Sequence, residues 1–443
     1  TMGKLDLNNP KLAINGGSKI RTNPFPAYNT IGKEEESAVL RVLRSGKLST
    51  YLGAWHDDFY GGREVQLLEK EWAEYFNVKH AISVNSATSG LYAAIGAIGI
   101  NPGDEVIVSS YTMSASATAI LMYGGIPVFA DIEEDYYCLD VHSIKEKITS
   151  KTKAIIVVDI FGQAYDADAI NSLAKEYNLK VIEDTAQAPG AKYGNKYAGT
   201  LGNIGVFSLN YHKHIHCGEG GIIVTDDDEL ALKLQLIRNH AEAVIGSKGY
   251  NDKKELINMV GFNYRMTEIE ASIAREQLRK LPLLIEERIA NIKYLQDGLS
   301  SIPAISCTKV RNKSTHVYYA NPLQYDSKLA NGIHRNKFID AVKAELPNTL
   351  LREDSAVLLG YGYVKPLYLL PLYQEKIAFG NQGYPFNLSN NTNYDKGICP
   401  ITEDMHYNKL VSHEFMRPGM KKRDLDDVIS AFQKVWINRS ELC

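Results

Sequence analysis

The sequence predicts an α/β fold in which a mostly parallel central sheet is covered by helices on both faces. Between residues 78 and 230, short apolar runs alternate with segments of helical pattern. Runs that are apolar throughout are typical of strands buried on both faces, and their alternation with helices is typical of a parallel sheet. The predicted strands are HAISVNS, DEVIVSS, IPVFADI, AIIVVDI, KVIEDTA, IGVFSLN and GGIIVTD.

The elements follow in chain order. Residues 1–30 are expected to form an N-terminal arm, and residues 31–285 a large domain that contains the sheet. EEESAVLRVLRSG predicts a helix that ends at Gly46, because glycine favours the left-handed turn after a helix. Further helices are predicted between the strands, in SGLYAAIGAI, ASATAILMYG and ADAINSLAKEYN.

A second, smaller α/β domain is expected over residues 286–443. The helical stretch from NYRMTEIEASIAREQL to NIKYLQDGL leads into it, and Pro282 is expected to bend or divide that helix. DLDDVISAFQKVW predicts a final helix with one apolar face for packing.

Residues 351–400 are rich in Tyr, Pro, Gly and Asn. Long irregular segments in compact domains are often functional. We expect this insertion to line the mouth of the substrate site and its tyrosines to set specificity. The alternative is that they only pack the loop. The tyrosines concerned are Tyr361, Tyr363, Tyr368 and Tyr373.

Composition narrows the function classes. The net charge of −3 gives no reason to expect nucleic acid as a partner. The five cysteines are scattered without a CxxC pair, which indicates reduced thiols and a cytoplasmic protein. No apolar run reaches the roughly 18 residues needed to span a bilayer, and no secretion signal is seen, so no membrane association is predicted. No GxGxxG follows a strand, which argues against a nicotinamide dehydrogenase.

The run NYHKHIHCGEGG at 210–221 offers two interpretations. His212, His214, His216 and Cys217 are ligand types that suit zinc. On an extended chain, however, the alternate histidines lie about 6–7 Å apart, too far to share one tetrahedral ion. No second ligand doublet is found elsewhere, so no metal is predicted, and the histidines are expected to hold a loop by hydrogen bonds.

The other interpretation makes Lys213 the working residue, as the attachment point of pyridoxal 5'-phosphate. A lysine bound to this cofactor needs a carboxylate beside the pyridine nitrogen, and Asp184 ends an apolar strand upstream. The phosphate needs donors. Ser86, Ala87 and Thr88 lie where a strand turns into a helix, whose free N–H groups bind anions, and Ser208 is a further candidate.

With these residues in this order, the chain resembles the DegT-type (DegT/StrS) sugar aminotransferases, which are pyridoxal-phosphate enzymes of fold-type I. The resemblance covers roughly residues 25–436. It rests on SVNSATSGLYAAI, NPGDEVIVSSYT, GGIPVFADI, VIEDTAQAPGAKYGNKYAGTLGNIGVFSLNYHKHIHCGEGG and GFNYRMTEIEASIAREQL.

The resemblance implies a role for each matching residue. Lys213 would form the Schiff base and move protons, Asp184 would pair with the pyridine nitrogen, and Gln187 would bond the ring hydroxyl. The phosphate would be held by Ala87, Thr88 and Ser208, with Asn263 reaching the phosphate of the neighbouring subunit of a homodimer. Where the family usually has an aromatic residue stacked on the ring, this chain has Met113, and Tyr111 is the alternative platform.

The resemblance also implies the reaction. An amino acid, most often L-glutamate, would donate its amino group to a keto-sugar in aminosugar or surface polysaccharide biosynthesis, and this keto-sugar is expected to be linked to a nucleotide. PLYLLPLYQ resembles the insertion of members that aminate keto-cyclitols or sugars without a nucleotide, so these remain alternatives. Members that act as sugar dehydrases carry His in place of the lysine, and here Lys213 occupies that position. A non-catalytic protein of this fold is expected to lack the lysine or the carboxylate.

Overall fold

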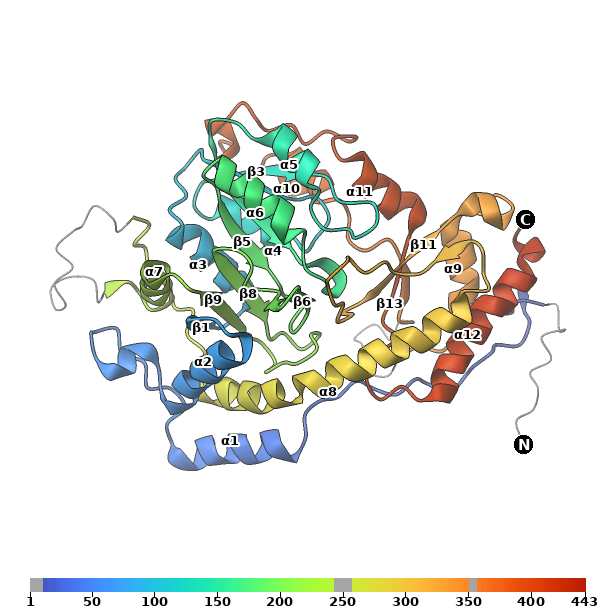
Figure 1. Ribbon diagram of the computed structural model, residues 1–443, viewed down its shortest axis with the longest axis horizontal. Coiled ribbons are helices and arrows are strands. Elements are labelled where there is room, and N and C mark those ends of the chain that lie inside the picture. The colour runs from blue at the N-terminus through green and yellow to red at the C-terminus, as the bar shows by residue number, and fades with distance from the viewer. Residues whose placement is uncertain (1–10, 243–256, 350–356) are drawn as a thin grey trace.

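The computed structural model describes residues 11–242, 257–349 and 357–443 (Figure 1). Its centre is a seven-stranded sheet in the order β1-β9-β8-β5-β4-β2-β3. β9 runs antiparallel to both of its neighbours, and the remaining neighbours pair in parallel, which confirms the predicted mostly parallel sheet. The strands are β1 His80–Val84, β2 Glu105–Ser109, β3 Ile126–Ala130, β4 Thr152–Val158, β5 Lys180–Asp184, β8 Ile204–Ser208 and β9 Gly221–Thr225.

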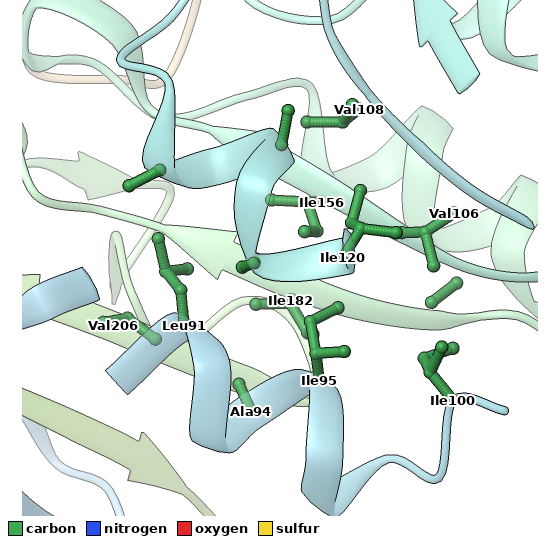
Figure 2. Packing of buried hydrophobic residues seen from close by; sticks show 14 of the residues in the cluster. Leu91, Ala94, Ile95, Ile100, Val106, Val108, Ile120, Ile156, Ile182 and Val206 are labelled. Carbon is green, nitrogen blue, oxygen red and sulfur yellow. The ribbon is translucent and has the colours of Figure 1, made fainter. Parts of the chain in front are cut away.

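Helices cover both faces of this sheet, as predicted. On one face, Leu91 and Ile95 of α3 and Ile120 of α4 pack on strand residues such as Val106 and Ile156 (Figure 2). This face is covered by α3 Ala87–Ala97, α4 Ala115–Leu121 and α7 Asp228–Arg238. The other is covered by α2 Arg63–Phe76, α5 Val141–Lys147, α6 Ala167–Glu176 and the first half of α8.

The helix α8, Glu268–Leu299, runs from the large sheet to the C-terminal unit as one continuous element (Figure 1). Thr267 caps it by accepting from the backbone N–H of Glu270. The alternative that Pro282 divides this helix is wrong, and the alternative that Pro282 bends it stays a prediction. Proline removes one backbone hydrogen bond, and burial of the neighbouring Leu278 and Leu281 against the large domain holds the helix together. The helix α1, Lys33–Ser45, packs along α8.

The C-terminal unit is a four-stranded antiparallel sheet in the order β10-β11-β13-β12 with helices packed on it. Leu12 and Phe25 of the N-terminal arm lie in the same core. The elements are β10 Ile305–Ser306, β11 Asn321–Tyr325, β12 Leu359–Tyr361, β13 Leu410–His413, α9 Arg335–Ala344 and α12 Lys422–Ile437. Within the described ranges, no helix combines the length and apolar character that crossing a membrane requires.

The tyrosine-rich insertion behaves differently from the prediction. Its first residues, up to 356, lie outside the described part of the chain. Farther on, Tyr368 and Tyr373 are fully buried in the core of the large domain, where both rings meet Phe129 of β3. Because β3 is an edge strand, the aromatic segment shields it from solvent, and Tyr394 donates a hydrogen bond of 2.8 Å to the carbonyl of Pro127. This segment contains α10 Pro371–Gln374 and leads into α11 Pro400–Asp404.

Candidate functional site

A pocket of about 440 Å³ opens where the carboxyl ends of the strands meet the first turn of α3. Ligand sites in open α/β sheets occur at this edge, and the volume suits a cofactor or a small substrate. Every residue predicted to bind the cofactor within its own chain lines this pocket. They are Ala87, Thr88, Met113, Asp184, Gln187, Ser208 and Lys213.

The start of α3 forms the anion site that the sequence predicts. Ser86 is the N-cap, its hydroxyl accepting from the N–H of Ser89, and the next two residues begin the helix beside the pocket. First-turn N–H groups have no partner within a helix, so they can bind a phosphate. Gly221 makes this turn possible, because a Cβ there would lie 2.7 Å from the nitrogen of Ala87.

Asp184 ends β5 and is held by two donors. Its Oδ2 accepts from the hydroxyl of Ser116 over 2.7 Å, and its Oδ1 accepts from the N–H of Ala186 over 3.2 Å. Burial raises the pKa of Asp184, while Ser116, Ala186 and the charge of Lys213 pull it back down. A buried carboxylate in this setting gains most from a cationic partner, which a protonated pyridine nitrogen provides. The residues present thus fit pyridoxal phosphate.

Lys213 lies in the loop between β8 and β9, half-buried, with its Nζ 4.4 Å from the centre of the Tyr319 ring. Burial lowers the pKa of Lys213, and the carboxylates of Asp184 and Glu414 partly oppose this. The lowered pKa favours the neutral amine, which is the nucleophilic form.

The histidines around Lys213 hold the loop in place. His214 is buried, and its Nε2 donates to the carbonyl of Val317 over 2.7 Å. The Nδ1 of His216 accepts from Gly218, and the hydroxyl of Tyr28 in the N-terminal arm donates to the carbonyl of His214. In the described residues, which include this whole run, no three His, Cys, Asp or Glu side chains are grouped to hold a metal.

The structure separates Met113 from Tyr111, the two residues considered for stacking on the cofactor ring. Met113 lines the pocket with 53% of its surface exposed. Tyr111 is fully buried, with its hydroxyl hydrogen-bonded to Nδ1 of His406, and it does not line the pocket. The prediction that Tyr111 offers a platform for the cofactor is therefore wrong. Asn263 is exposed and lies outside the pocket of its own chain, so its reach toward a neighbouring subunit stays a prediction.

Of the four tyrosines predicted at the substrate mouth, Tyr363 lines the pocket. Tyr361 is 38% exposed, and the guanidinium of Arg335 lies 5.6 Å from its ring. Tyr368 and Tyr373 belong to the core, as described above. The expected role in specificity is thus contradicted for the two buried rings.

Several residues at or behind the pocket escaped the sequence analysis. Ser116, near the start of α4, does not line the pocket but donates to Asp184, which does, and a hydroxyl shortly after a predicted strand was a usable signal. Glu219, which accepts from the amide of Asn210 over 2.9 Å, carries no distinguishing pattern. Tyr319 also gave no signal, because it reaches the site from the C-terminal unit.

Comparison with known proteins places this site in a family. The family profile "DegT/DnrJ/EryC1/StrS aminotransferase family" matches residues 29–433. The chain is 31% identical over 420 residues to the spore coat polysaccharide biosynthesis protein SpsC of Bacillus subtilis (strain 168), covering 94% of this chain and 98% of that protein. It is 28% identical over 437 residues to L-glutamine:2-deoxy-scyllo-inosose aminotransferase of Streptomyces lividus, covering 97% and 99%.

A solved structure agrees with these relatives. The aminotransferase from Psychrobacter cryohalolentis matches with a TM-score of 0.76 and 27% identity, over 94% of this chain and 99% of that one. The aminotransferases of the matching family depend on pyridoxal phosphate, which confirms the expected cofactor. Because the family profile spans nearly the whole chain, this protein belongs to the DegT/DnrJ/EryC1/StrS aminotransferase family.

Proposed function

We propose that this aminotransferase moves an amino group from L-glutamate to a keto-sugar used in polysaccharide or aminosugar biosynthesis. One observation carries the proposal: Lys213 and Asp184 line the same pocket beside the helix start that suits a phosphate. The relative from Bacillus subtilis is named for spore coat polysaccharide biosynthesis, which supports the substrate class.

The residues of the chain divide the work. When bound, pyridoxal phosphate supplies an electron sink that stabilises negative charge on the substrate carbon. Asp184 would pair with the protonated pyridine nitrogen, and the first turn of α3 with Ser208 would hold the phosphate. Lys213 would attach the cofactor and then move a proton to and from the substrate, a task that its lowered pKa favours.

A keto-cyclitol or a keto-sugar without a nucleotide is the second candidate substrate. Among the described residues lining the pocket, Lys213 is the one lysine or arginine, whereas Asp184 and Glu219 are acidic. A nucleotide diphosphate would therefore need cations from elsewhere, such as the second subunit of a homodimer. The relative from Streptomyces lividus is named as acting on 2-deoxy-scyllo-inosose, which agrees with this alternative.

The homodimer belongs to the proposal, as does the cytoplasmic location. In a shared site, the exposed Asn263 would reach the phosphate bound by the neighbouring subunit. Mixing K213A with N263D chains, each expected to be inactive alone, tests this, because hybrid dimers would hold one intact site and regain part of the activity. Activity that stays absent in verified hybrid dimers would contradict a shared site.

The first experiment is an absorption spectrum of the purified protein before and after L-glutamate, with K213A alongside. We expect a visible cofactor band that bleaches with glutamate and is absent from K213A. A protein that takes up no pyridoxal phosphate would refute the proposal. A band that ignores glutamate but bleaches with L-glutamine would change the donor and keep the reaction. Product analysis with nucleotide-linked and free keto-substrates then separates the two substrate classes.

A further inference from the structure

The side-chain amide of Gln187 is held at both ends. Its Oε1 accepts from the backbone N–H of Phe161 over 2.7 Å, which fixes the orientation of the amide. Its Nε2 donates to the hydroxyl of Tyr363 over 2.8 Å. An amide nitrogen carries two hydrogens, so one N–H of Gln187 remains to donate into the pocket that this residue lines.

The anchor on the oxygen side is a strained residue. Phe161 has a φ of +63°, a left-handed conformation that bulky side chains rarely adopt. Its carbonyl accepts from the N–H of Tyr319 over 2.8 Å, and its ring meets that of Tyr363 edge-on at 5.2 Å. Strain that persists under such restraint is typical of functional sites, and here it aims a backbone N–H at Gln187.

The anchor on the nitrogen side comes from the C-terminal segment. The Tyr363 ring lies against Phe161 on one side and Tyr111 on another, which fixes its hydroxyl beside Gln187. Burial raises the pKa of Tyr363 to about 12, so the hydroxyl stays neutral near pH 7. Since it accepts from Gln187, its own hydrogen is directed elsewhere, and the residue lines the pocket.

We propose that Tyr363 is a positioning residue, whose hydroxyl holds the Gln187 amide so that the remaining N–H donates to the ring hydroxyl oxygen of the cofactor. The inference deepens the proposed function and rests on it. It makes the segment after β12 part of the cofactor site. Of the four tyrosines that sequence alone could not separate, Tyr363 is thereby given a definite role.

The test is the pH midpoint of the visible cofactor band in the loaded protein. A donated N–H favours the ionised form of the ring oxygen. Y363F removes the hydroxyl that positions this N–H, so the variant is expected to raise the midpoint by about one pH unit, a tenfold change in proton binding. Q187L is expected to shift it in the same direction, and the double variant no further than Q187L. Y363F keeps the ring and its packing. Y373F is the matched control, because the buried Tyr373 hydroxyl has no partner among the described residues.

Each result decides the matter. A midpoint unchanged in Y363F but raised in Q187L would overturn the positioning role, as would fully additive shifts in the double variant. An equal shift in Y373F would show that any lost hydroxyl in this segment disturbs the site, and would also overturn it. A wild-type protein without a visible band would instead refute the proposed function, together with the inference.

Discussion

Removal of the Ser116 hydroxyl is expected to weaken cofactor binding by changing the ionisation of Asp184. Ser116 donates to Asp184 over 2.7 Å, and both side chains are buried. A hydrogen bond to a charged group contributes about 1.5–3 kcal/mol. Its loss in S116A therefore makes ionisation of Asp184 about 10- to 100-fold less favourable and raises further a pKa that burial has already raised.

The expected result is a pH-dependent loss of affinity. Wherever the pH lies below the pKa of Asp184, the carboxylate must lose a proton before it can pair with the pyridine nitrogen. The affinity of the apoprotein for pyridoxal phosphate should therefore fall about 10- to 100-fold in S116A at low pH, with a smaller loss as the pH rises. Absorbance titrations at several pH values measure this directly.

The control is S110A. Ser110 also makes a buried hydrogen bond of 2.7 Å, with the hydroxyl of Thr402, whereas the side chain of Asp184 bonds Ser116 and Ala186. Affinity equal to wild type at every pH in S116A would refute the reasoning. An equal loss in S110A would show that the effect comes from a damaged core.

Three further results are expected. Burial beside Glu183 raises the pKa of Asp159 well above its usual value. The stability that the neutral acid contributes is therefore present at low pH and lost as the pH rises through the folded-state pKa. Circular dichroism should show that D159N melts at a higher temperature than wild type at pH 8 and at the same temperature at pH 4. Y368F should lower the free energy of unfolding by about 1.5–3 kcal/mol, as measured by urea denaturation, because the variant loses the hydrogen bond of 2.6 Å that Tyr368 donates to Glu403. Dialysis against EDTA should leave the affinity for the cofactor unchanged, because the Nε2 of His214 donates to a backbone carbonyl and is not available to bind a metal. A loss of affinity that zinc restores would contradict this.

Two of the predicted site residues that the structure brings to one pocket come from strand ends. Asp184 and Ser208 each close a run that is apolar throughout, and parallel strands bring their carboxyl ends to one edge. A polar residue at the end of a predicted strand is therefore expected at the ligand site. Tyr319 and Ser116 escaped this reasoning for different physical reasons. Tyr319 arrives from the C-terminal unit, and Ser116 acts through Asp184 rather than on a ligand.

The tyrosine-rich segment shows where composition stops being informative. A tyrosine can bury its ring or present its hydroxyl, and sequence alone cannot choose between these. Tyr368 and Tyr363 are five positions apart, yet one fills the core beside β3 and the other bonds Gln187 in the pocket. The choice depends on which surface each ring meets, an exposed sheet edge or the strained turn at Phe161. The aromatic rings that follow Tyr363 are buried against the large domain and anchor the chain on the C-terminal side of Tyr363. That attachment can hold the Tyr363 hydroxyl at the cofactor site.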